Sequence, residues 1–397
     1  MSIIRKTFEN GAGILHLLPT WIPRPFNRPG KRLRLHPDDY FAMGMERGAI
    51  VERWFSSVTC AETKGAGKNE GMSYVSTDGT QENKILLKEF VDELKADLIG
   101  TELIEKFGTW PMYSKLYDYE MPLFHHIHHG EEASKRVGVK PKFEHYFFPK
   151  QYNQYLGTLP VSYFGFDPSV SKEEVLGRLK DYTKKDIRIT ELSRAFRLEL
   201  DTGWYTPAGV VHAPGSLCTY EPQWNSDVMA MWENVVNGEV FLYKSLSAYL
   251  PEEDKDNLEK VLEVADWEIN TAGDYRARYF RRPVTEQKGD GYEQQWICYG
   301  NDYIGAKKLE VEPGKSVLIQ DDCAYGCLVI QGYGTLGKFD CEAPQMIRFG
   351  QVTADEFFVS KERAKAGVNI ANHSKYEPLV ILKHFGPDGN ILPLENA

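Results

Sequence analysis

Histidines are concentrated in one short part of this 397-residue chain, and their spacing constrains how the chain can fold. Five of the ten histidines lie in the segment 123–149, LFHHIHHGEEASKRVGVKPKFEHYFFP. Residues i and i+2 of a strand point to the same face, so His126 and His128 can reach one ion if this segment is extended. A downstream Glu144 and a distant His212, which follows a Pro-x-Gly turn, complete a set of four candidate ligands. The fold must bring these separated positions together.

The donor types indicate which metals suit this set. Imidazole nitrogens with one carboxylate favour Zn, Fe, Mn or Ni over Ca or Mg. We expect one divalent ion per chain, Zn first, with Mn, Fe or Ni as alternatives. His125, His129 and His145 fall on another strand face or just past it, and we interpret them as neighbours of the ligands. A register slip of one residue would exchange His125 for His126.

The charge balance and the apolar pattern exclude several classes of partner. The chain has 57 acidic and 47 basic residues and a net charge of -10, which argues against nucleic acid. No stretch approaches the ~20 apolar residues of a membrane span, and the start, MSIIRKTFENGAG, lacks the apolar core of a signal peptide. Six scattered cysteines are ordinary for a reduced compartment. We therefore expect a cytoplasmic protein without membrane partners.

Local patterns predict the main elements of the first three quarters of the chain. Residues 1–40 are rich in proline and basic side chains and indicate an extended arm or loop, while 49–59 alternates as a strand does. Gly100 divides the clearest helical region, and Ser171 is a candidate N-cap of a second helix. The expected helices are 83–107, 171–185 and 251–267.

The last hundred residues change to short β-rich runs punctuated by glycine, which is typical of a sandwich or jelly roll. We predict a mainly β fold with two jelly-roll units and a helical insertion. Residues 1–110 are expected to form an arm, strands and a helical part associated with the first unit. Residues 111–235 are expected to form the metal-binding unit, with its helical insertion at about 165–190. A helical connector (236–285) and a second unit (286–397) are expected to follow.

These pieces resemble the cupin superfamily, whose metal ligands come from an HxH pair, a Glu and a later His. The run 207–212, PAGVVH, fits the PxGxxH element of that superfamily. The longer context resembles the type I mannose-6-phosphate isomerases through most of the chain. ERWFSS (52–57) is similar to that family's ExWxxS strand, KFE (142–144) to its Lys-x-Glu element, and EPQWNSD (221–227) to its Glu-x(4)-Ser-Asp run.

The resemblance implies a bicupin fold and a metal-dependent isomerase that interconverts mannose 6-phosphate and fructose 6-phosphate through an enediol. It implies His126, His128, Glu144 and His212 as ligands. Glu221 is then the candidate acid/base, and Lys142 is the candidate cation near the substrate oxygens. Charge alone nominates further cations for the phosphate, namely Lys140, Arg278 and Arg281.

Two positions depart from the family pattern. His126 stands where the family usually has Gln, and Met231 stands where an Arg is expected four residues after Asp227. A missing guanidinium removes a cation for a substrate oxyanion or phosphate. Two alternatives therefore stay open: a non-catalytic sugar-binding or regulatory cupin, and an Fe(II) cupin oxygenase that uses the same ligands.

The second β-rich unit lacks an HxH pair and a ligand glutamate. Val368 occupies the place of the last histidine, and His373 is displaced from it. We expect a metal-free cupin repeat. Exposed β edges also make a homodimer a reasonable expectation.

Overall fold

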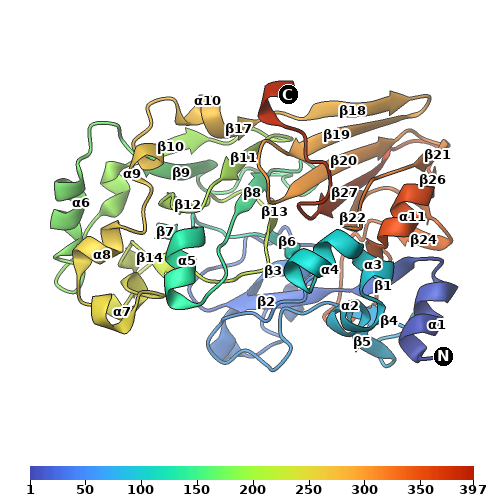
Figure 1. Cartoon of the computed structure of the whole chain (residues 1–397), viewed down its shortest axis with the longest axis horizontal. Helices are drawn as coiled ribbons and strands as arrows, with labels where there is room; N and C mark the ends of the chain where they lie inside the picture. Colours follow the sequence, from blue (N-terminus) through green and yellow to red (C-terminus); the bar gives the residue numbers. More distant parts are fainter.

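Antiparallel strands dominate the chain, as its alternating apolar positions predict. The computed structural model describes residues 1–397, except for the side chain of Asn396. The strands form four large sheets and one short ribbon. In Figure 1 the four sheets follow one another along the long axis, as the layers of two sandwiches placed back to back. This is the mainly β, two-unit jelly-roll architecture that the sequence predicts.

The first sandwich consists of a five-stranded and a seven-stranded sheet. In spatial order the five-stranded sheet contains β10 (Ser193–Arg197), β9 (Val161–Phe166), β12 (His212–Ala213), β7 (His126–Ile127) and β14 (Ala230–Met231). The seven-stranded sheet contains β17 (Phe280–Arg281), β11 (Gly203–Thr206), β8 (Glu144–Phe147), β13 (Thr219–Trp224), β6 (Met112–Tyr117), β3 (Ala49–Phe55) and β2 (Thr20–Arg24). A separate ribbon pairs β15 (Val235–Val236) with β16 (Glu239–Val240).

The second sandwich consists of a nine-stranded and a four-stranded sheet. The nine-stranded sheet contains β18 (Val284–Gly289), β19 (Tyr292–Cys298), β20 (Gly305–Val311), β27 (Leu379–Phe385), β22 (Tyr325–Gln331), β25 (Glu356–Val359), β1 (Ile14–Leu18), β4 (Tyr74–Ser76) and β5 (Lys84–Leu86). The four-stranded sheet contains β21 (Ser316–Ile319), β26 (Val368–Asn372), β23 (Tyr333–Leu336) and β24 (Phe339–Glu342).

Short helices surround the sandwiches. They are α1 (Ile3–Asn10), α2 (Leu87–Leu94), α3 (Ala96–Ile99), α4 (Thr101–Phe107), α5 (Glu131–Val137), α6 (Lys172–Leu179), α7 (Tyr243–Leu246), α8 (Leu258–Leu262), α9 (Trp267–Asn270), α10 (Tyr275–Tyr279) and α11 (Lys361–Ala366). Helices α6 and α8 lie at one end of the view and α1 and α11 at the other, while α4 and α5 lie over its middle (Figure 1). None of the helices in the part of the chain that the structure describes is both long and apolar enough to cross a bilayer.

Several predicted elements are present in shortened form. Ser171 caps α6 by accepting a hydrogen bond from the backbone N–H of Glu174, as predicted, but the helix ends at Leu179. Gly100 divides the 83–107 region as expected, and Lys95, with φ of 49°, adds a second break. The 251–267 region contains a 3-10 turn (Glu252–Asp254), α8 and the first residue of α9. Short helices are marginally stable on propensity alone and persist where an apolar face packs against the rest of the protein.

The prediction of an extended arm over residues 1–40 is wrong. Ser2 caps a real helix, α1, and two strands follow it: β1 pairs with β25, and β2 pairs with β3. Pro23 is tolerated because β2 lies at the sheet edge, where a missing N–H breaks no inner ladder. Residues 1–110 thus contribute strands to both sandwiches, not to the first unit alone.

The seven- and nine-stranded sheets pack against each other through apolar side chains and one buried ion cluster. Arg53 of β3 donates two hydrogen bonds to Asp355, at 2.8 and 2.9 Å, and approaches Glu356 of β25 to 3.4 Å. Burial raises the pKa of the Glu356 carboxyl to about 8, although Arg53 opposes this effect. Asp355 accepts most of the arginine's hydrogen bonds, and the raised pKa of Glu356 favours its protonated form near neutral pH.

The raised pKa of Glu356 predicts a pH-dependent stability. The pKa of this carboxyl is about 8 in the folded state and near 4.5 in the unfolded state, so the folded state holds the proton more tightly. Its contribution to the free energy of unfolding is therefore fully present below pH 4.5 and is lost as the pH rises toward 8. We expect Glu356→Gln to remove a decline of up to about 1.4 kcal/mol per pH unit in this window. Urea unfolding at several pH values measures this difference.

The control for this experiment is Glu342→Gln, at an exposed position of β24. Its unfolding free energy should follow the parent protein at every pH. A Glu356→Gln variant that keeps the parent's full decline would show that Glu356 is ionised in the folded state.

Candidate metal centre

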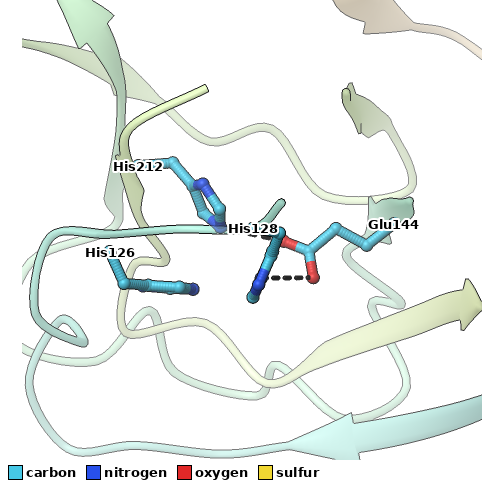
Figure 2. Close-up of side chains that lie close together, drawn as sticks. All are labelled: His126, His128, Glu144 and His212. Carbon is cyan, nitrogen blue, oxygen red and sulfur yellow. Dashed lines mark ion pairs between the residues drawn. The ribbon is translucent and has the colours of Figure 1, made fainter. Parts of the chain in front are cut away.

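The four predicted ligand residues converge between the two sheets of the first sandwich (Figure 2). The five-stranded sheet carries the histidines. Strand pairing places His212 of β12 opposite His126 of β7, and His128 is the residue directly after β7. Glu144 is the first residue of β8 in the seven-stranded sheet. One ligand atom from each lies within 4.8 Å of the others, and all four side chains are buried. The predicted register, with His126 and not His125 in the set, is the one observed.

The turn before His212 is tied to the histidine pair by backbone contacts. Gly209 has φ of 86°, a conformation that favours glycine. Its N–H donates to the carbonyl of His128 at 2.9 Å. The Pro-x-Gly turn therefore fixes the distance between the HxH segment and the distant histidine.

Each clustered histidine donates its Nδ1 proton to a backbone carbonyl. The acceptors are Phe124 for His126 at 2.9 Å, Val228 for His128 at 2.8 Å and Val210 for His212 at 2.8 Å. A carbonyl oxygen can only accept, so Nδ1 carries the proton and the lone pair lies on Nε2. This is the tautomer and ring orientation that metal-binding histidines require.

Burial favours the neutral form of the imidazoles. It lowers the pKa of His126 well below its usual value, with the neighbouring His212 and His128 adding to the effect. Burial and the adjacent Lys142 ammonium lower the pKa of His128 to about 3. Neutral imidazoles are ready to bind a metal without first losing a proton.

Glu144 faces the histidines with both carboxylate oxygens. Oε1 lies 2.9 Å from Nε2 of His212, and Oε2 lies 3.2 Å from Nε2 of His128. Burial opposes ionisation, but the Lys142 ammonium outweighs it and the pKa of Glu144 lies well below its usual value. A carboxylate oxygen and an unprotonated Nε2 are both acceptors, and the buried Nε2 of His212 has no hydrogen-bond partner. A cation between them satisfies both, so these residues fit a divalent metal.

The other histidines of the segment lie outside this cluster. His125 pairs through Nδ1 with Glu233 at 2.9 Å. His129 is buried, and its ring centroid lies 6.2 Å from that of Tyr249. His145 alternates away from Glu144 on β8, and its buried ring nitrogens have no protein hydrogen-bond partner. Among the residues described, no histidine beyond the predicted three joins the cluster.

Lys142 and Glu221, the predicted catalytic pair, lie beside the ligands. The Nζ atom of Lys142 lies 2.8 Å from Oε2 of Glu144 and 3.5 Å from Oε1 of Glu221. Glu221 of β13 is opposite Lys115 of β6, and their charged groups are 3.3 Å apart. Burial raises the pKa of Glu221 to about 8, assisted by the nearby Glu144 and opposed by the two lysines. The carboxyl can therefore be either protonated or ionised near neutral pH.

Sequence reasoning missed Arg24, a buried guanidinium in the wall of the site. Arg24 of β2 contacts Glu52 at 2.8 Å and Asp227 at 3.0 Å. Those partners are 28 and 203 positions away in the chain, so no local pattern marks the residue. Met231, at the position where the family has Arg, pairs with His126 across the sheet. The site therefore contains a guanidinium, but on another strand.

A small cavity of about 20 Å³ adjoins the ligands, with His126, Glu144, Lys142 and Glu221 in its lining. It has room for about one water molecule. Three cations were nominated for a phosphate by charge, and Lys140 is not in this lining. Arg278 pairs with Asp274 at 2.8 Å, and Arg281 donates hydrogen bonds to backbone carbonyls. Those three nominations receive no support from the structure.

The interior of the second sandwich holds a different polar cluster. Lys307 of β20 and Lys383 of β27 are opposite each other, and Asp321 lies 2.8 Å from both ammonium groups. Gln294 accepts a further bond from Lys383 at 2.7 Å. In the described part of the chain, only the first sandwich holds a group of potential metal ligands of this kind. His373 is exposed in the second unit.

Comparisons with known proteins give structural matches only. No family model matches the chain, and no curated protein sequence matches it. Mannose 6-phosphate isomerase from Bacillus subtilis superposes with a TM-score of 0.62 at 16% identity, covering 94% of this chain and 99% of that chain. A variant of phosphomannose isomerase from Salmonella typhimurium gives a TM-score of 0.62 at 10% identity, with 94% and 100% covered.

A mannose 6-phosphate isomerase bound with zinc and yttrium gives a TM-score of 0.61 at 10% identity, covering 94% of this chain and 99% of that chain. These matches establish the fold. The chain has the cupin-type fold of the mannose-6-phosphate isomerases over nearly its whole length.

The convergence of the four ligands predicts a single tight metal site. We expect the protein loaded with Zn to retain one equivalent after dialysis. His128→Ala and His212→Ala should each lose most of the metal, because each removes a donor that nothing nearby replaces. His373→Ala, in the second sandwich, should keep one equivalent. Elemental analysis that finds two tight equivalents in the parent, or full content in His212→Ala, would contradict the assignment.

Proposed function

We propose that this protein is a metal-dependent aldose–ketose isomerase that interconverts mannose 6-phosphate and fructose 6-phosphate. The observation that carries the proposal is the position of Glu221, a buried carboxyl 3.5 Å from Lys142 and close to the ligand Glu144. Oε1 of Glu221 has no hydrogen-bond partner in the protein. A carboxyl with one oxygen that accepts no hydrogen bond thus borders the cavity at the ligand cluster. The fold shared with mannose 6-phosphate isomerases supports the same assignment.

His126, His128, Glu144 and His212 would hold the metal. When bound, the ion would supply Lewis-acid polarisation of the sugar oxygens. Three imidazoles and a carboxylate suit Zn well and also accept Mn, Fe or Ni.

Glu221 is assigned the role of acid and base. The interconversion of an aldose and a ketose moves one proton from C2 to C1 and a second from the C2 hydroxyl to the C1 oxygen, and it passes through an enediol. As a carboxylate, Glu221 takes the proton from C2 of the aldose, and as the carboxylic acid it returns the proton to C1. A pKa near 8 suits both steps, because the two forms coexist near neutral pH.

Lys142 is assigned the role of stabilising negative charge. Although burial opposes it, Glu144 and Glu221 raise the pKa of Lys142, so the side chain is an ammonium. It lies between the ligand carboxylate and the acid/base, where charge develops on the sugar oxygens as the proton leaves carbon. A fixed cation in a dry site stabilises such charge more than it would in water.

The second candidate function is a sugar-binding or regulatory protein without turnover. Met231 favours it, because a thioether cannot donate to an oxyanion as an arginine does. Arg24 does not replace that donor directly, since both Glu52 and Asp227 already hold it.

Replacement of the proposed acid/base should separate the two candidates. We expect the parent to isomerise mannose 6-phosphate in D2O and to incorporate solvent deuterium at carbon. Glu221→Gln should lower kcat at least about 100-fold, because general acid–base catalysis contributes this much or more. Proton NMR of the sugar follows both turnover and exchange.

The metal content of Glu221→Gln should equal that of the parent, which distinguishes loss of the base from loss of the ion. Glu239→Gln, on the exposed ribbon strand β16, serves as the control and should keep full activity. A parent protein that binds sugar phosphate but shows neither turnover nor exchange with Zn, Mn, Fe or Ni would favour the binding protein instead.

A further inference from the structure

The cations nearest the metal centre are already neutralised by carboxylates. Lys142 contacts Glu144 at 2.8 Å, and Lys115 contacts Glu221 at 3.3 Å. Arg24 uses all of its N–H groups on Glu52, Asp227 and Thr63. A phosphate would have to displace a buried carboxylate to bind any of them, at the cost of leaving that carboxylate unpaired. A phosphorylated substrate must therefore find its phosphate partner elsewhere.

A second, larger cavity lies directly outside the metal centre. It has a volume of about 460 Å³ and shares Arg24, Phe26 and Met229 with the lining of the small cavity. Cavities of 300–1,000 Å³ are typical of small-molecule sites, whereas the inner cavity holds about one water. We name this larger cavity the vestibule. A sugar whose carbonyl end reaches the ligands would leave its other end here.

The walls of the vestibule are mostly apolar and suit the C–H faces of a sugar chain. Phe26, Met229, Met231, Phe241 and Tyr249 line it. Phe26 packs edge-on against Phe241, with ring centroids 6.4 Å apart. Met231, the residue at the family's arginine position, lies in this wall, so the wall itself offers no cation at that position.

Two exposed lysines complete the lining of the vestibule. Lys64 follows Thr63, the residue that holds Arg24, and Lys244 lies on α7. Within the described part of the chain, neither ammonium has a carboxylate oxygen within 4.0 Å, unlike the three cations of the inner site. Of the acidic groups in the same lining, Asp227 pairs with Arg24, and Glu62 accepts a hydrogen bond from the Tyr249 hydroxyl.

We propose that Lys64 and Lys244 bind the phosphate group of the substrate and take over the role of the arginine that is absent at position 231. This inference rests on the proposed function, because it assumes that the carbonyl end of the substrate lies at the metal centre. It goes further by naming the two residues that select a phosphorylated over an unphosphorylated sugar. Lysines act as flexible point charges, so we expect selection by charge more than by shape.

The test is the kinetics of Lys64→Ala, Lys244→Ala and the double variant on two substrates. We expect the double variant to raise KM for mannose 6-phosphate about 10-fold, since each exposed ion pair contributes a few-fold. We expect kcat to change less than about 2-fold, because neither lysine approaches the ligands or Glu221. Turnover of unphosphorylated mannose should be unaffected. Lys64→Arg with Lys244→Arg should keep the parent KM, since the charges remain.

Lys375→Ala, an exposed lysine of the second sandwich, is the matched control and should resemble the parent. Calorimetric binding of inorganic phosphate to the metal-loaded protein gives a readout that needs no turnover. We expect binding to the parent and to Glu221→Gln, and clearly weaker binding to the double variant.

The outcomes distinguish this inference from the proposed function. Unchanged KM and unchanged phosphate binding in the double variant would overturn the role of the two lysines while leaving the isomerase intact. Phosphate binding that depends on the lysines in a protein without turnover would support the anion site and overturn the isomerase. Neither turnover nor phosphate binding in the parent would overturn both.

Discussion

The centre depends on three hydrogen bonds from imidazole Nδ1 atoms to backbone carbonyls. They fix the tautomer and leave each Nε2 unprotonated, and the Nε2 atoms of His212 and His128 lie against the oxygens of Glu144. The acceptor for His128 is the carbonyl of Val228, next to Asp227, which Arg24 holds from the far edge of the seven-stranded sheet. The ion network around Arg24, in the wall of the site, thus holds the segment whose carbonyl orients His128.

The two sandwiches have similar architecture but differ in how the charged side chains in their interiors are paired. A mostly apolar interior tolerates charge only where it is paired. In the first unit Glu144 is balanced by Lys142 and, we propose, by a metal ion. In the second unit Lys307 and Lys383 would repel each other across the strand pair, and Asp321 between them relieves this. Glu286, which contacts Lys307 at 2.8 Å, supplies a second carboxylate, so two ammonium groups are paired with two carboxylates in this cluster.

The sequence predicted the parts of the site that follow from local geometry or from a family pattern. The strand period put His126 and His128 on one face, and the resemblance supplied Glu144, His212 and the two-sandwich fold. Arg24 could not be predicted, because its carboxylate partners are 28 and 203 positions away in the chain and only tertiary packing brings them together. The prediction of an N-terminal arm was wrong for the same reason, because β1 forms a strand by pairing with β25, which is far along the chain.

The most direct test of the metal centre is X-ray absorption spectroscopy of the Zn-loaded protein. The account predicts a first shell of light donors with the multiple-scattering signature of three imidazoles and no sulfur contribution. Spectra with fewer than three imidazoles, or with a sulfur donor from one of the six cysteines, would contradict the assignment of His126, His128 and His212.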